Sequence, residues 1–222
     1  MKFSNTYILY PDNKALERAV ASSLGMLSEE LVEAATPDTQ VTTADNFLHT
    51  RGNFEQRSFS TKIFESMREA LVAALTDEYR AQDAASWAAK QNSLGNIHAG
   101  LGQLQRDETS YEKAIQCFNN ALEVFNQEES PLEWAATQYN LGTASQALGR
   151  LLDDSKPLKK AVDAYTKALL VWTRDESPED WMYTMHQLGA TFHTYGKQLK
   201  GNRTFQKSVV AYKNALAVLD AD

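Results

Sequence analysis

The sequence predicts an all-α protein, an α-solenoid that is a right-handed superhelix of antiparallel helical hairpins. Two observations predict this fold. First, the phrase WAAKQNSLG at 87–95 returns as WAATQYNLG at 134–142 and as WMYTMHQLG at 181–189, an interval of 47 residues. Second, apolar and small residues downstream of each phrase recur at spacings of three and four, the period of an amphipathic helix. A fixed interval of this length is typical of stacked helical units that share one continuous core.

Composition narrows the function classes. With 222 residues, 43% of them hydrophobic, the chain is long enough for one large domain or a short repeat array. The formal net charge of −7 argues against a nucleic-acid partner, which requires a basic face. A single cysteine, Cys117, excludes an internal disulfide and a thiolate metal cluster. No segment approaches the roughly 20 apolar residues of a membrane span, so we expect a cytoplasmic protein with no membrane partner.

Residues 1–60 are predicted to form an N-terminal helical segment, with a capping helix and a degenerate first repeat. The first helix of that repeat falls near 44–52, and the polar stretch 36–45 before it is predicted to be a loop. The capping helix is indicated by apolar residues at helical spacing, namely Leu16, Val20, Leu24, Leu27 and Leu31.

Residues 61–222 are predicted to form the array. Its parts are a half repeat at 64–83 and three repeats at 84–130, 131–177 and 178–222. The first helix of each repeat is expected to begin after a capping residue, and these are Asp83, Ser130 and Ser177. Each first helix is expected to stop at a glycine in the left-handed conformation, at Gly102, Gly149 and Gly196.

A second helix follows in every repeat, marked by one stripe of aromatic, alanine and leucine residues. The stripe comprises Tyr111, Ala114, Phe118, Ala121 and Leu122, then Leu158, Ala161, Tyr165, Ala168 and Leu169, then Phe205, Ser208, Tyr212, Ala215 and Leu216. Large side chains alternating with small ones let two helices approach closely. Each repeat is therefore predicted to be a helical hairpin that buries both faces only when its neighbours stack on it.

The order of these residues, Leu-Gly, then alanine, an aromatic, Ala-Leu and a proline, resembles the tetratricopeptide repeat. The period of 47 exceeds the usual period of roughly 34, so the chain resembles the extended-period, bacterial-type variants of that family. The resemblance implies a non-enzymatic interaction module, scaffold or adaptor whose first helices line a concave groove for a peptide or a partner helix.

Counting from each Leu-Gly pair carries the groove positions of the family onto this chain. The residues expected to bind a peptide are Asn92, Asn96, Tyr139, Asn140, Thr143, Gln146, Tyr183, His186 and His193. Amide side chains both donate and accept hydrogen bonds, so they suit the backbone of an extended peptide whatever its side chains are.

Two alternatives remain open. The chain is a self-assembling scaffold if its C-terminal end pairs with another copy, and the predicted contact residues are Val209, Leu216 and Leu219. It is a small-ligand binder or an enzyme if a site lies near the N-terminal segment, around His49, Arg51 and Tyr79. We find no catalytic, metal-binding or cofactor motif, and we expect neither a metal ion nor a cofactor.

Overall fold

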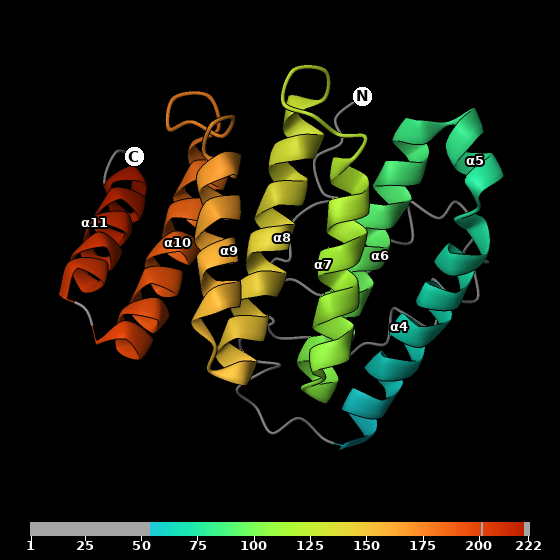
Figure 1. The fold of residues 1–222 in the computed structure, drawn as a ribbon, viewed down its shortest axis with the longest axis horizontal. Helices are drawn as coiled ribbons and strands as arrows, with labels where there is room; N and C mark the ends of the chain where they lie inside the picture. Colours follow the sequence, from blue (N-terminus) through green and yellow to red (C-terminus); the bar gives the residue numbers. More distant parts are fainter. Residues whose placement is uncertain (1–53, 201, 220–222) are drawn as a thin grey trace.

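The computed structural model describes residues 54–200 and 202–219. Within those ranges every regular element is an α-helix, and the helices follow one another as a row of upright rods (Figure 1). The all-α prediction is therefore confirmed. The predicted capping helix, the loop at 36–45 and the degenerate helix near 44–52 lie outside the described residues.

The three predicted hairpins are present. The described helices are α4 (Phe54–Ala74), α5 (Asp77–Gln82), α6 (Ala84–Gln105), α7 (Glu108–Leu122), α8 (Pro131–Leu152), α9 (Ser155–Ala168), α10 (Pro178–Leu199) and α11 (Asn202–Leu219). The first helix of each hairpin (α6, α8 and α10) packs against its own second helix (α7, α9 and α11), and each of α7 and α9 also packs against the next first helix. The first helices contact one another as well, so they form an inner layer that runs along the array.

The starts of the helices follow the expected positions but not always the expected chemistry. Asp83 caps α6 as predicted, because its carboxylate accepts a hydrogen bond of 3.0 Å from the Ser86 backbone. Ser130 and Ser177 stand at the N-cap positions with a proline next, but neither side chain caps its helix. The hydroxyl of Ser130 is held instead by the backbone N–H and C=O of Asn126, at 3.0 and 3.2 Å.

The predicted helix stops at Gly102, Gly149 and Gly196 are wrong. Each first helix continues for three more residues and ends at a left-handed residue that is not glycine; these are Arg106, Asp153 and Lys200, with φ of 56°, 51° and 50°. The backbone N–H of each donates to the carbonyl of the glycine four residues earlier, which satisfies an otherwise open acceptor at a cost of about 1 kcal/mol in backbone strain.

These three glycines are required by packing inside the helix rather than by helix termination. A Cβ on Gly102 would stand 3.0 Å from the ring of Tyr111, and one on Gly149 would stand 2.7 Å from Leu158. The glycines of the Leu-Gly pairs, seven residues earlier on the same helix, face the second helix in the same way. Each first helix therefore carries two glycines that let an aromatic or leucine side chain of its partner lie on the bare backbone.

The tryptophans that open each repeat lie between repeats. Trp87 is buried with Ala121 and Phe125, and Trp134 packs against that cluster and the next one. An arginine stacks on two of the indoles: the guanidinium carbon of Arg80 lies 4.4 Å from the ring centre of Trp87, and that of Arg174 lies 6.0 Å from Trp181. Arg80 and Arg174 are separated by two repeat lengths, and Gln127 stands at the equivalent position between them, before Trp134.

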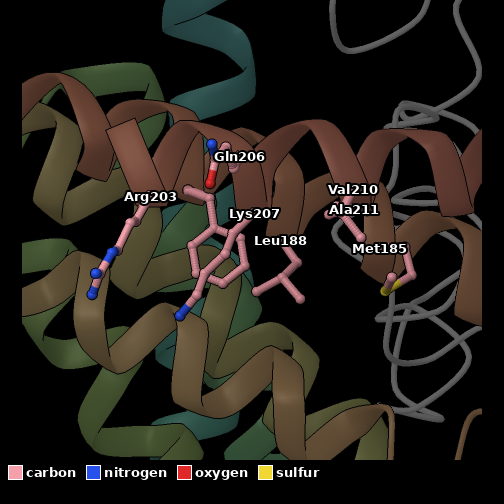
Figure 2. Close-up of a pocket in the computed structure, with 8 residues that line it drawn as sticks. Met185, Leu188, Arg203, Gln206, Lys207, Val210 and Ala211 are labelled. Carbon is pink, nitrogen blue, oxygen red and sulfur yellow. The ribbon is translucent and has the colours of Figure 1, made fainter. Parts of the chain in front are cut away.

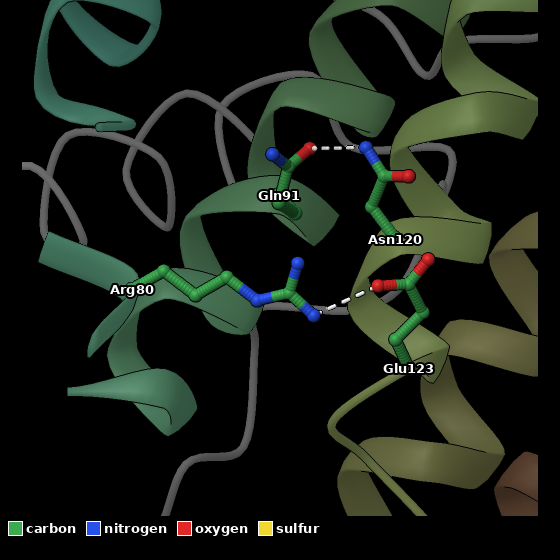
Figure 3. A network of polar contacts seen from close by, with 4 residues as sticks. All are labelled: Arg80, Gln91, Asn120 and Glu123. Atoms are coloured by element: carbon green, nitrogen blue, oxygen red, sulfur yellow. Dashed lines mark hydrogen bonds and ion pairs between the residues drawn. The ribbon is translucent and has the colours of Figure 1, made fainter. Parts of the chain in front are cut away.

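The same two arginines reach forward to the end of the next second helix, and Figure 3 shows the contact of Arg80. Arg80 donates to the Glu123 carboxylate at 2.8 Å, and Arg174 donates to the Ala217 carbonyl at 2.7 Å. Beside the first of these contacts, the Asn120 amide donates to the Gln91 amide oxygen at 3.5 Å. The two exposed arginine contacts join one repeat to the next, whereas the partly buried Asn120–Gln91 contact joins α7 to α6 within the first repeat.

Candidate functional site

The nine residues predicted to bind a peptide all lie on the inner layer, on α6, α8 and α10, but in two different environments. Five are buried, namely Asn92, Asn96, Tyr139, Asn140 and Gln146. Tyr183, His186 and His193 of α10 are exposed, and Thr143 of α8 is half-buried. The structure therefore brings the nine together along one layer, and only the α10 members are exposed.

The buried amides connect neighbouring first helices. The Asn140 amide donates to the Asn92 amide oxygen at 3.2 Å, which joins α8 to α6. The Gln146 amide donates to the Thr191 hydroxyl at 2.8 Å and to the Gln187 carbonyl at 3.2 Å, which joins α8 to α10. Hydrogen bonds between fully desolvated amides are directional, so they fix how one repeat sits on the next.

Tyr139 and Thr143 are held in the core of the second repeat. The ring centre of Tyr139 lies 5.5 Å from that of Tyr165 and 5.7 Å from that of Trp172. The hydroxyls of Thr143 and Tyr165 are 3.1 Å apart and share a hydrogen bond. Complete burial, with the Tyr139 phenol nearby, raises the pKa of Tyr165 well above its usual value, so this phenol stays neutral.

On α10 the equivalent positions face outward. His186 and His193 occupy the repeat positions of Tyr139 and Gln146, which the next first helix covers. In the described part of the chain no helix packs beyond α10 on that side, so both imidazoles are exposed. Each lies against the second helix of its own hairpin, with ring centres 5.5 Å from Tyr212 and 5.6 Å from Phe205.

The remaining groups with potential reactivity are buried. Burial, with Lys113 and Arg68 nearby, lowers the pKa of His98 to about 4, so it is neutral at pH 7. Burial raises the pKa of the Cys117 thiol to about 12, which leaves almost no thiolate. Within the described ranges no three histidine, cysteine or acidic side chains gather where a metal ion would fit.

The residues of the two alternative sites are found as follows. Val209 and Leu216 are 52% and 58% exposed on α11, and Leu219 is the last residue of that helix. Tyr79 is half-buried on α5. His49 and Arg51 lie outside the described residues.

Sequence reasoning missed one feature, an apolar cavity between α10 and α11 with a volume of about 550 Å³. The signal was present in the repeat alignment. Met185 and Phe192 replace polar residues that stand at the same positions of both earlier repeats, Gln91 and His98 in the first and Gln138 and Ser145 in the second.

Together, the stacked hairpins, the glycine-to-aromatic contacts within them and the amide contacts between them define a helical repeat array. The model of the tetratricopeptide repeat family matches residues 87–131, which span α6, α7 and the start of α8. The chain therefore carries a tetratricopeptide repeat, as the resemblance implied. Comparison with curated proteins found no significant match, and neither did comparison with solved structures.

The repeat supports a role in protein–protein interaction or as a scaffold, and its family is generally non-enzymatic. Among the described helices, none combines the length and the apolar character that crossing a bilayer requires.

Proposed function

We propose that this protein is a non-enzymatic cytoplasmic interaction module that binds a peptide or a partner helix along its inner layer. The observation that carries the proposal is the row of exposed side chains on α10, Tyr183, His186 and His193, next to the buried amide contacts of α6 and α8. At about 1.5 Å of rise per residue these three span roughly 15 Å, the length of four or five residues of an extended peptide.

The two environments of the predicted residues suggest two roles. Imidazole and phenol groups each pair with backbone or side-chain polar groups, and their rings offer apolar area, so the exposed α10 residues are suited to contact a partner. The buried amides hold the first helices in register and keep that surface rigid, which lowers the entropy cost of binding. The net charge of −7 favours a protein over a nucleic acid as the partner.

Selection from a random peptide library on the immobilised protein tests this proposal. The triple variant Tyr183→Ala, His186→Ala, His193→Ala should lose the enrichment of peptides that the wild type selects. Circular dichroism checks that its helicity is kept, since the variant also loses the ring contacts of His186 with Tyr212 and of His193 with Phe205. A matched control replaces three exposed residues of α7, Glu112, Gln116 and Asn119, by alanine and should select as the wild type does. Equal selection by the wild type and the α10 variant would remove the inner layer as the binding surface.

A second function, self-assembly through the C-terminal repeat, is favoured by a separate observation. Val162 and Leu169 of α9 pack partly buried against the cluster that includes Leu188 of the next repeat. Val209 and Leu216 stand one repeat later and are more than half exposed. They lie seven residues apart, on one face of α11, so a second copy would cover the same pair of positions that a following repeat covers elsewhere.

Light scattering as a function of protein concentration tests self-assembly. If this face is the contact, the mass should rise above that of one chain, and Leu216→Glu should return it to one chain. Leu170→Glu makes the same change at a leucine that follows α9 and is 59% exposed, and it should leave the oligomer intact. A single-chain mass at every concentration would dismiss this function without affecting peptide binding.

A further inference from the structure

A cavity lies between α10 and α11, the two helices of the last hairpin (Figure 2). Its floor is apolar and its rim is polar. The lining residues are Met185, Leu188, Phe192, Arg203, Gln206, Lys207, Val210 and Ala211.

At two positions of the floor, the third repeat has apolar residues where the earlier repeats have polar ones. Met185 and Phe192 are both half-exposed in the third repeat. The polar residues at the same positions of the two earlier repeats are buried; these are Gln91, His98, Gln138 and Ser145. Burial ordinarily favours apolar side chains and exposure favours polar ones, and here the order is reversed. An apolar residue at the more open position indicates a surface that another group covers.

The first repeat shows what fills this place elsewhere in the array. Leu94 and Cys117 stand at the positions of Leu188 and Ala211, and they are buried in one cluster with Phe64 and Met67 of α4. A helix that presents bulky apolar side chains therefore closes the first repeat over these positions. At the third repeat the helix equivalent to α4 is α9, on which the smaller Leu158 and Ala161 stand at the positions of Phe64 and Met67. A cavity of about 550 Å³ lies beside Leu188 there, within the range of ligand and side-chain pockets.

The rim is positively charged. Arg203 and Lys207 border the cavity, and the Lys207 ammonium lies 5.6 Å from the ring centre of Phe192. Segment 195–217 contains five lysine or arginine residues and no acidic residue, in a chain whose net charge is −7. The α9 helix carries exposed lysines, Lys156 and Lys160, at the repeat positions of Arg203 and Lys207. Exposed basic side chains thus stand at equivalent positions on α9 and on the α11 rim of the cavity.

We propose that this cavity docks an acidic segment of a partner protein, which inserts a bulky apolar side chain against Met185, Leu188 and Phe192 while its carboxylates pair with Arg203 and Lys207. A guanidinium binds a carboxylate through paired hydrogen bonds. The ammonium of Lys207 leaves the face of the Phe192 ring and pairs with a carboxylate of the partner. The charge of the rim selects an acidic partner, and the hollow selects one with a large apolar side chain. Five of the eight lining residues lie on α11, and none of the eight is an α10 residue proposed to contact a peptide, so this inference does not depend on peptide binding along the inner layer.

Fluorescence anisotropy with a designed labelled peptide, a Leu-Phe pair flanked by glutamates, tests the proposal on the full chain. The wild type should bind this peptide, and binding should weaken as salt rises from about 0.05 to about 0.3 M, because screening shortens the reach of the rim charges. A peptide with alanines in place of Leu-Phe should bind at least about tenfold more weakly, and so should one with lysines in place of the glutamates. Equal binding of all three peptides would overturn the proposal.

A matched pair of variants locates the site. Lys207→Glu, alone or with Arg203→Glu, should weaken the glutamate peptide by about tenfold or more. Lys113→Glu makes the identical change at the same repeat position of α7, two repeats earlier, where α4 fills the space, and should bind like the wild type. With ¹³C-methyl methionine, the peptide should shift the Met185 methyl resonance and leave that of buried Met67 unchanged.

Two results would contradict this assignment. One is equal weakening by Lys207→Glu and Lys113→Glu, which would mean that only net charge matters. The other is a peptide that leaves Met185 unperturbed while Lys207→Glu dissociates an oligomer seen by light scattering. The cavity would then be an interface between copies of this chain.

Discussion

The ring of Tyr165 lies so close to Gly142 that a Cβ on the glycine would stand 2.8 Å from its Cδ1 and Cε1 atoms. The same relation holds between the first and second helices of the other hairpins, where Gly95 faces Phe118 and Gly189 faces Tyr212. In every repeat an aromatic ring therefore lies on the bare backbone of the Leu-Gly glycine, which is the physical reason that the Leu-Gly pair returns at a fixed interval.

Gly142→Ala should lower the free energy of unfolding by about 1–3 kcal/mol, because overpacking a tight contact outweighs the gain of roughly 1 kcal/mol in helix propensity. Chemical denaturation monitored by circular dichroism measures the change. Combining the substitution with Tyr165→Leu should lose less than the sum of the two single changes, since the smaller side chain makes room for the methyl group.

Gly196→Ala is the control for this prediction. Its Cβ would stand 3.1 Å from the ring of Phe205, which is half-buried and free to yield, so a smaller loss is expected. If both alanine variants were more stable than the wild type, propensity rather than the close approach would govern these positions.

Asn140→Ala should cost about 1–3 kcal/mol of stability, because it leaves the buried Asn92 oxygen without the amide that donates to it at 3.2 Å. Replacing both asparagines by leucine should cost less than the two single alanine changes together, since neither then leaves a buried polar group unmatched. Thermal melting of the set decides this. Additive losses would show that the two side chains do not act as a pair.

Acid should destabilise the protein through His98. Its pKa is about 4 when folded and 6.5 when unfolded, so the unfolded state binds the proton more tightly. The stabilisation from neutral His98 is complete above pH 6.5 and is lost as the pH falls from 6.5 towards 4, by on the order of 2–3 kcal/mol. His98→Gln cannot titrate, so its unfolding free energy should change less over that interval. A parallel decline in the variant and the wild type would assign the acid sensitivity to other groups.

Cys117 should resist alkylation in the folded protein. A thiol with a pKa of about 12 has almost no thiolate at pH 8, and its side chain is 8% exposed. Reaction with a thiol reagent should therefore follow global or local opening and accelerate sharply in denaturant. Rapid labelling at pH 8 without denaturant, with unchanged circular dichroism, would contradict the buried placement.

The helix pattern was predictable because each of its signals acts over a few residues. Asp83 fixes where α6 begins through a bond to a residue three positions away, and the stripe from Tyr111 to Leu122 follows from helical geometry alone. The helix stops were mispredicted because glycine has two uses. At Gly102 and its counterparts glycine is required because it has no Cβ, which allows close packing. A single sequence does not distinguish this requirement from that of a left-handed residue at a helix end.

The candidate site was less predictable than the fold. Asn92 and His186 stand at the same repeat position on the inner layer, two repeats apart, yet Asn92 is buried and His186 is exposed. That difference depends on whether a further helix packs over the position. The cavity at Met185 and Phe192 likewise depends on how α11 sits on α10, although the polar-to-apolar exchange at those positions was visible in the alignment of the repeats.

By itself the sequence determined that this protein is a stack of two-helix units with a 47-residue period, because periodicity, caps and small-to-large alternation are local and additive signals. Only the tertiary structure decided which equivalent residues are covered and which are open. Identical positions acquire different exposure when one repeat has a neighbour over it and another does not, and that depends on packing across about 47 residues rather than on the residue or its immediate neighbours.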